Sequence, residues 1–236
     1  MVSAVTEAQR SCSQILWVYV LVGAAVFVVT RFEQAPVVGA YLHLVVAAIF
    51  LGASLQLARG EQQHYGIALG GLLEPADDER PRGPLGLWDL GRALWEALPS
   101  ALRELSIAFG VAIIVFPLYG LGFAAFQEPT RELSLSLPPS LPTLALTQWL
   151  LVALPEEAFF RGYLQTALSD LETGRVRFLG VSLAPRGWML QAALFALLHL
   201  AVQPQPARLA VFFPALLFGW LRAWRGGIGA ASALHA

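Results

Sequence analysis

The chain has 236 residues, of which 57% are hydrophobic and only 13% are charged. Its mean hydropathy is +0.62, and a soluble domain of this length could not bury so much apolar surface. The formal net charge of −1 provides no basic surface for nucleic acid, and the single cysteine, Cys12, excludes an internal disulfide. The composition therefore indicates a membrane protein.

Apolar runs of about the length of a bilayer core recur along the chain. The first is expected to be a retained span rather than a signal peptide, because no clear small-residue cleavage site follows it. The expected membrane helices are 15–31, 36–58, 105–126, 141–168, 188–203 and 208–224, with a seventh that begins near Ile228. The sequence thus predicts an all-α fold, a polytopic membrane bundle of about seven transmembrane helices.

The arginines indicate how this bundle is oriented. A cytoplasmic N-terminus places eleven of the fifteen arginines in inner loops, three in outer loops and Arg161 within the membrane, in accord with the positive-inside rule. All basic residues are arginine, which suggests the codon usage of a GC-rich bacterial genome. We therefore expect a multi-pass protein of the bacterial cell (inner) membrane with a cytoplasmic N-terminus.

The longest connection, residues 59–104, changes character midway. A polar, proline-bounded turn region at 74–82 precedes leucines at helical spacing, which oppose charged residues and are accompanied by Trp88 and Trp95. This pattern is typical of a helix that lies in the membrane interface. An ordinary amphipathic helix packed on the bundle is the alternative. Residues 1–140 are accordingly interpreted as N-terminal membrane helices with this cytoplasmic or interfacial segment inserted.

The stretch from Leu154 to Arg161 places charge inside an otherwise apolar run. An ionisable side chain at the centre of a bilayer costs roughly 2.5–3.5 kcal/mol, so three charges within six residues require pairing or a function. Pro155 fits the first turn of a helix, on which Glu157 and Arg161 are four residues apart and can neutralise each other. Glu156 is rotated by about 100° from Glu157 and is free to activate a water. It is the candidate base.

Two histidines occupy later apolar helices. His199 closes a run that includes Phe195, and His235 follows a glycine-rich turn and Ser232. A single histidine in a helix is usually satisfied by a neighbouring hydrogen bond. Carboxylates from one helix and imidazoles from two others can, however, converge inside a bundle and form a site for metal or activated water.

These residues resemble a known family. Glu156-Glu157 with Arg161, then Phe195-x-x-x-His199, then Ser232-x-x-His235 are similar to the three ordered motifs of the CPBP, or Abi, intramembrane proteases, which include the type II CAAX prenyl endopeptidases. The resemblance covers 141–236, which is interpreted as the protease core. It implies hydrolysis of a peptide bond within the membrane boundary.

The resemblance also implies roles for the motif residues. Glu156 would activate the water with help from His199, Glu157 and Arg161 would hold the helix and tune the site, and His235 would stabilise the oxyanion. Phe195 is assigned to substrate binding. Two histidines and a glutamate can also form a zinc set with an open position, whereas a carboxylate and an imidazole can polarise water without metal. The resemblance favours the metal-free version, so no metal ligand and no cofactor is assigned.

One departure from the family pattern concerns the last motif. In the family an asparagine or aspartate follows the last histidine by four residues, whereas this sequence ends at Ala236. Either the natural chain continues into a further turn or an eighth helix, or this member lacks that polar group. We favour the first interpretation. The second would weaken catalysis, because loss of one oxyanion donor commonly costs on the order of 10²–10³ in rate.

Two non-proteolytic functions remain as alternatives. The charged residues could form an ion-pair network in a non-catalytic membrane scaffold or immunity protein. They could also serve a small transporter, with Pro155 marking a broken helix, although no inverted repeat supports this. For the protease, the expected partners are the lipid bilayer and a membrane-anchored protein or lipidated peptide that is cleaved in its C-terminal or embedded part.

Overall fold

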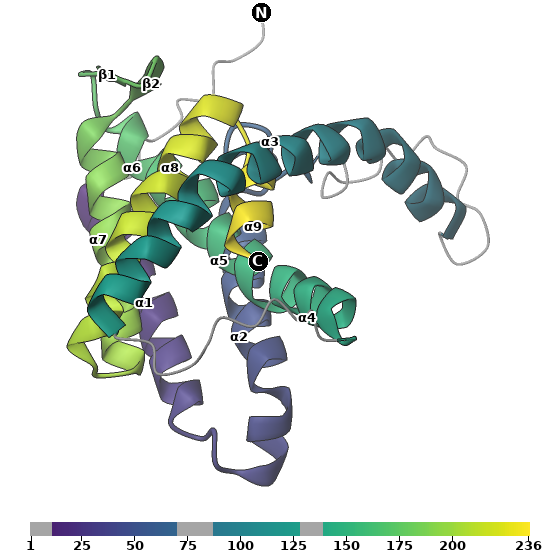
Figure 1. Cartoon of the computed structure of the whole chain (residues 1–236), viewed down its shortest axis with the longest axis vertical. Coiled ribbons are helices and arrows are strands. Elements are labelled where there is room, and N and C mark those ends of the chain that lie inside the picture. The colour runs from purple at the N-terminus through teal and green to yellow at the C-terminus, as the bar shows by residue number, and fades with distance from the viewer. Residues whose placement is uncertain (1–10, 70–86, 128–138) are drawn as a thin grey trace, which may run out of the picture.

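The computed structural model describes residues 11–69, 87–127 and 139–236 (Figure 1). Within these residues the chain folds into a bundle of helices with one small β-hairpin. Four helical stretches are long and apolar enough to cross a membrane, so the chain is a polytopic helical membrane protein. They are Cys12–Thr30, Pro36–Leu57, Gly91–Gly122 and Pro206–Arg225.

The N-terminal helices α1 (Cys12–Thr30) and α2 (Pro36–Leu57) form an antiparallel pair. Ser11 begins α1 with a capping box, in which its side chain and that of Gln14 bond each other's backbone N–H groups. The Tyr19 hydroxyl donates to the Leu194 carbonyl at 2.9 Å, and Arg31 donates to the carbonyl of Val202. These bonds connect α1, near its middle and at its C-terminal cap, to α7 in the C-terminal part of the bundle.

The third helix, α3 (Leu87–Gln127), corrects one expectation. The interfacial helix and the span at 105–126 were expected as separate elements, but one continuous helix contains both, with Pro99 and Pro117 inside it. Each proline removes a single hydrogen bond, and the leucines, alanines and charged residues around Pro99 are strong helix formers. Trp95 is 75% exposed, whereas the side chain of Trp88 and the polar turn at 74–82 lie outside the described residues.

A continuous helical segment from Leu141 to Asp170 forms the centre of the bundle. It comprises α4 (Leu141–Gln148), the π-turn η3 (Trp149–Ala153), α5 (Leu154–Glu157), the π-turn η4 (Ala158–Leu164) and α6 (Gln165–Asp170). Pro155 therefore does not begin a helix, contrary to expectation. It follows a π-turn, in which the Leu154 N–H bonds the Trp149 carbonyl five residues back. The wider turn accommodates the proline ring without ending the helix.

The other elements pack around this segment. They are the hairpin β1 (Val176–Phe178) and β2 (Val181–Leu183), then α7 (Pro185–Val202), the 3₁₀ turn η5 (Pro206–Val211), α8 (Phe212–Arg225) and α9 (Gly229–His235). Phe159, Phe160 and Tyr163 of the segment are fully buried among them. Between ring centroids, Phe159 lies 5.5 Å from Phe50 of α2, and Phe160 lies 4.9 Å from Phe195 of α7. The helices expected at 141–168 and 188–203 are thus present, although neither is among the four stretches that qualify as spans.

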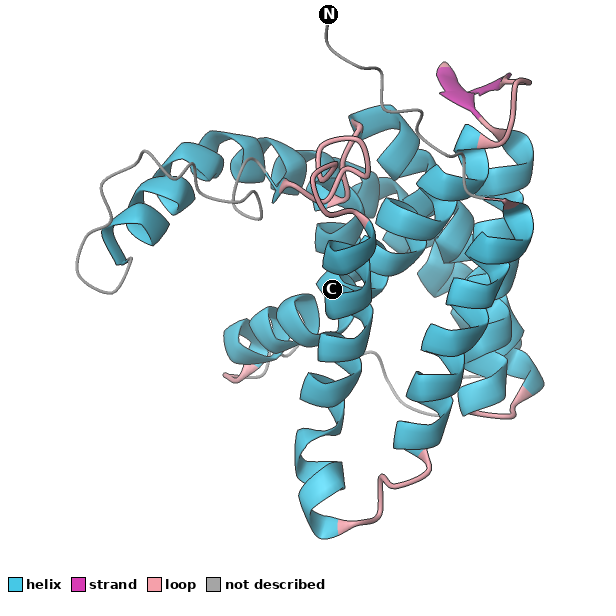
Figure 2. Cartoon of the chain, turned by 180° about the vertical axis from the view of Figure 1, so that it is seen from behind, coloured by secondary structure: helices cyan, strands magenta, loops and turns pink. Residues whose placement is uncertain are grey.

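The β-hairpin was not expected from the sequence. Its antiparallel strands pair Val176 with Leu183 and Phe178 with Val181, and its two-residue loop places Leu179 and Gly180 at φ of 47° and 81°. Two consecutive positive φ values suit the twist of a tight hairpin. The hairpin and the α1–α2 connection lie at opposite ends of the molecule (Figure 2).

Candidate active site

The charged cluster begins between the two π-turns of the central segment and extends into the second. Glu156 and Glu157 occupy α5, and Arg161 lies in η4. A π-turn contains one more residue per turn than an α-helix, so it changes the direction in which the following side chains point. In this way the segment directs its charged residues towards α9, which packs against α5 (Figure 1).

Glu157, Arg161 and His235 form a buried chain of contacts. Arg161 Nη1 lies 2.9 Å from Glu157 Oε1, and both side chains are 0% exposed. His235 Nδ1 lies 2.9 Å from the same oxygen. A carboxylate only accepts, so the ring proton sits on Nδ1 and neutral His235 keeps an acceptor at Nε2. Glu157 therefore both balances Arg161 and fixes the orientation of the imidazole.

Glu156 lies on the other side of the same imidazole. Its Oε2 atom is 3.7 Å from His235 Nε2, which exceeds a hydrogen bond but leaves both atoms within reach of one water. The Glu156 side chain is 14% exposed, and Oε2 is buried without a hydrogen-bond partner among the described residues. Glu157 Oε2 also lacks a partner among the described residues, but Glu156 is the carboxylate whose unpartnered oxygen lies beside His235 Nε2.

Aromatic rings enclose the guanidinium and the imidazole. Arg161 Cζ lies 4.3 Å from the ring centroid of Phe195 and 5.2 Å from that of Phe218, both within cation–π range. The Phe218 ring also stacks on His235 at 4.9 Å and 18°. Sequence reasoning missed Phe218, because nothing distinguishes it from the other apolar residues of α8.

Phe195 and His199 make other contacts than those that their predicted roles suggest. Phe195 is only 2% exposed and its ring supports Arg161 from within the core, so the predicted substrate contact is not available at this ring. His199 Nδ1 bonds the Phe195 carbonyl at 2.9 Å. Within the described part of the chain His199 makes no hydrogen bond or ion pair with either glutamate. The Phe195 ring contacts both imidazoles: its centroid is 4.3 Å from that of His199 and 6.2 Å from that of His235.

One polar contact holds α9, and thus His235, in place, and a second fixes the end of α8 that precedes it. Trp149 of η3 donates to Ser232 Oγ at 3.2 Å. Arg225, at the end of α8, makes a bidentate ion pair with Glu104 of α3, with an Nη2–Oε1 distance of 2.8 Å. Neither contact was predicted, since each joins residues more than 80 positions apart that form no motif.

The residues of the site do not form a metal set in this arrangement. Over residues 11–69, 87–127 and 139–236, no three His, Cys, Asp or Glu side chains gather as metal ligands. Glu157 is already bonded to Arg161 and His235, and His199 points Nδ1 at a backbone carbonyl.

Comparison with known families gives a match that covers this part of the chain. Residues 138–236 match the family model described as type II CAAX prenyl endopeptidase Rce1-like. This part of the chain is an Rce1-like domain. The resemblance seen in the sequence motifs is thereby confirmed, and the Rce1-like family is one of proteases. Helices α1 to α3 lie outside the match. No curated protein and no solved structure matches the chain.

Proposed function

We propose that the chain is an intramembrane endopeptidase that hydrolyses a peptide bond of a membrane-anchored protein or peptide. The observation that supports this most strongly is the position of His235 between two carboxylates, at 2.9 Å from Glu157 and 3.7 Å from Glu156. The Rce1-like domain supports a protease, and the family's description as prenyl endopeptidases supports a lipid-anchored substrate.

In the proposed mechanism Glu156 is the general base. Its unpartnered carboxylate accepts a proton from a water, and the resulting hydroxide attacks the carbonyl carbon of the scissile peptide. His235 Nε2 holds the same water, so the nucleophile is oriented by both side chains. Protonated Glu156 then gives its proton to the leaving amine, which restores the carboxylate as the carbon–nitrogen bond breaks.

Glu157 and Arg161 would set the charge of the site. Their pair is neutral, so Glu156 contributes one net negative charge when His235 is neutral, as a base requires. The Glu157–Nδ1 contact would also hold the ring of His235 in the orientation that presents Nε2 to the water. Both residues act on the reaction through their neighbours and are positioning residues.

The role of His199 is revised by its contacts. The predicted partnership with Glu156 is assigned to His235 instead, because His235 has the contact. His199 donates from Nδ1 to a carbonyl and keeps Nε2 to bind a water or, when protonated, the substrate carbonyl oxygen. Since His199 makes no hydrogen bond or ion pair with either glutamate in the described part of the chain, it would act on the substrate rather than on the base.

The test is cleavage of a membrane-anchored reporter, with and without a prenyl group, by the full chain in liposomes. Glu156→Gln keeps the size of the side chain but removes the base, and should lower kcat about 10²–10⁴-fold with an unchanged melting temperature. The matched control is Glu33→Gln, the same change at an exposed residue between α1 and α2, which should cleave like the unmodified chain.

A non-catalytic scaffold is the alternative that one observation favours. Glu157 and Arg161 are fully buried and four residues apart, as a purely structural pair would be. That function does not explain Glu156, whose charge is not needed to balance Arg161. No cleavage by the unmodified chain would favour the scaffold and refute the proposed protease, whereas equal cleavage by the unmodified chain and Glu156→Gln would refute Glu156 as the base.

A further inference from the structure

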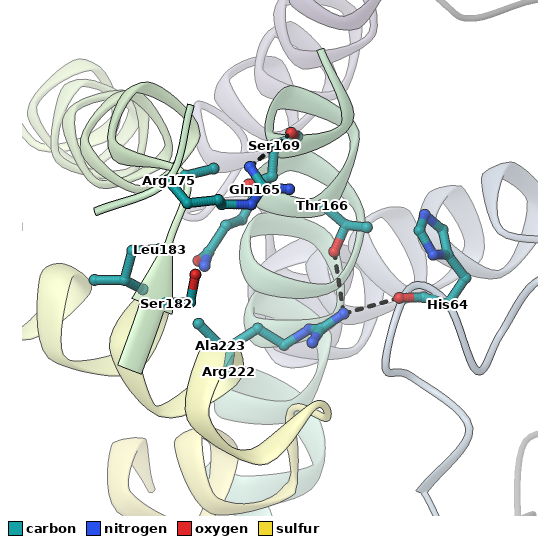
Figure 3. Close-up of a pocket in the computed structure, with 10 residues that line it drawn as sticks. His64, Gln165, Thr166, Ser169, Arg175, Ser182, Leu183, Arg222 and Ala223 are labelled. Carbon is teal, nitrogen blue, oxygen red and sulfur yellow. Dashed lines mark hydrogen bonds between the residues drawn. The ribbon is translucent and has the colours of Figure 1, made fainter. Parts of the chain in front are cut away.

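A second polar site lies at the end of the bundle that carries the hairpin (Figure 3). It is a hollow of about 220 Å³, formed where α6, β2, α8 and the loop at 58–69 meet. Its polar lining comes from two arginines, an imidazole, hydroxyls and an amide: Arg175, Arg222, His64, Thr166, Ser169, Ser182 and Gln165. None of these residues belongs to the proposed peptidase site.

Arg222 provides a fixed positive charge in this hollow. It is only 9% exposed, and its Nη2 donates to the His64 carbonyl at 2.9 Å and to Thr166 Oγ1 at 3.1 Å. Its Nε atom is buried and has no hydrogen-bond partner in the described part of the chain. Gly66 packs so closely that a Cβ there would be 2.7 Å from Arg222 Cζ. The guanidinium is therefore held in one place by neutral groups.

Arg175 approaches the hollow from the side opposite Arg222 (Figure 3). Its Nη1 donates to the carbonyls of Ser169 and Glu172, at 3.2 and 3.4 Å, so its charge also meets neutral oxygens. Thr166 accepts from Arg222, which leaves its hydroxyl proton free to donate into the hollow. Exposed Ser182 of β2 adds a second hydroxyl.

The nearest carboxylates are engaged elsewhere. Asp170 bonds His64 Nε2 at 2.9 Å, and Glu172 accepts from the backbone N–H groups of Arg186 and Gly187 at the start of α7. Neither is among the residues that line the hollow. Two guanidinium groups with hydroxyl donors and no lining carboxylate form a site suited to an anion with several oxygen atoms.

The position of the hollow indicates where that anion comes from. Arg222 lies in the last turn of α8, at the end of the candidate membrane span Pro206–Arg225. This is the depth of the lipid headgroups, and basic pockets between membrane helices recognise anionic headgroups. We propose that the hollow binds a phosphate group, supplied by an anionic phospholipid of the surrounding leaflet. This inference does not depend on the proposed peptidase activity.

The test compares lipid retention by the purified full chain in native mass spectrometry. Dioleoyl phosphatidylglycerol should be retained, and dioleoylglycerol, which has the same acyl chains without phosphate, should not. Arg175→Gln should weaken phosphatidylglycerol binding about tenfold, the usual effect of one lost charge-assisted hydrogen bond. Ser182→Glu, which adds a carboxylate at an exposed position of the lining, should abolish it by charge repulsion.

The matched control is Arg177→Gln, which removes the same charge from an exposed residue of β1 that does not line the hollow. Its lipid retention should stay within about twofold of that of the unmodified chain. Equal losses for Arg175→Gln and Arg177→Gln would show general attraction to basic surface and overturn the proposal. Retention of dioleoylglycerol would do the same. Displacement of the lipid by millimolar inorganic phosphate would support the phosphate site but assign it to soluble phosphate.

Discussion

Two arginines, Arg161 and Arg222, are buried in the described bundle, but their neighbours differ. Arg161 has a carboxylate at 2.9 Å, aromatic rings around it and 0% exposure. Arg222 lies beside a hollow, and among the described residues it is hydrogen-bonded only to a carbonyl and a hydroxyl. A buried charge must be paired or hydrogen-bonded. In the described bundle the charge of Arg161 is therefore balanced by a carboxylate in contact with it, whereas the charge of Arg222 meets neutral oxygens.

The largest effect should follow from removing the paired arginine. Arg161→Met leaves Glu157 buried opposite no cation and should lower the free energy of unfolding by about 3–5 kcal/mol. Arg222→Met breaks hydrogen bonds to neutral groups only and should cost about 1–3 kcal/mol. Denaturant titration in mixed micelles would measure both.

A double variant separates charge from packing. Arg161→Met combined with Glu157→Gln removes both charges and should be more stable than Arg161→Met alone, because no unpaired ion remains. If Arg161→Met and Arg222→Met cost the same, or if the second change brings no recovery, the contrast between the two arginines is wrong.

A smaller effect is expected at Gly66, whose backbone touches the Arg222 guanidinium. Gly66 has a φ of +65°, and a methyl group added there would lie 2.7 Å from Arg222. Backbone strain and crowding together should lower the free energy of unfolding of Gly66→Ala by about 2–3 kcal/mol. Gly60→Ala has a similar φ of +82° but nothing within 4 Å, so it should cost only about 1 kcal/mol. Equal melting temperatures for the two variants would mean that the contact with Arg222 is not tight.

The smallest effect concerns the ion pair that fastens α3 to α8. Glu104→Gln weakens the bidentate contact with Arg225 and should lower the free energy of unfolding by about 1 kcal/mol. The side chain of Glu104 is 17% exposed and that of Arg225 is 12% exposed. The control is Glu96→Gln, which should leave the melting temperature unchanged. Glu96 contacts Arg92, four residues away on the same helix, at 3.9 Å, and both side chains are well exposed. A loss with Glu96→Gln as large as that with Glu104→Gln would contradict the assignment.

The sequence predicted those parts of the site that follow from spacing and motif. Helical spacing predicts the contact of Glu157 with Arg161, and the ordered motifs predict that His235 lies near the glutamates. The Rce1-like domain was likewise recognisable from these motifs. These features depend on local geometry or on residue types that are rare in apolar helices, so they stand out without a structure.

The remainder could not be predicted because it depends on contacts between distant segments. Pro155 is typical of a helix start, and only the packed structure shows that a π-turn carries the helix through it. Phe218 is one apolar residue among many, yet it stacks on His235. The hollow beside Arg222 is assembled from α6, β2, α8 and the loop at 58–69, which share no sequence pattern.

The loop at 58–69 makes the Rce1-like domain less modular than its motifs suggest. The Gly66 carbonyl accepts from the Ile228 N–H at 3.0 Å, Tyr65 stacks on Tyr163, and Gly162 has no room for a side chain because Ile67 lies against it. A fragment limited to 138–236 would lose all three contacts, including the bond to Ile228, which sets the turn into α9. Transplanting this region into another protein would thus require the first two helices and their loop to travel with it.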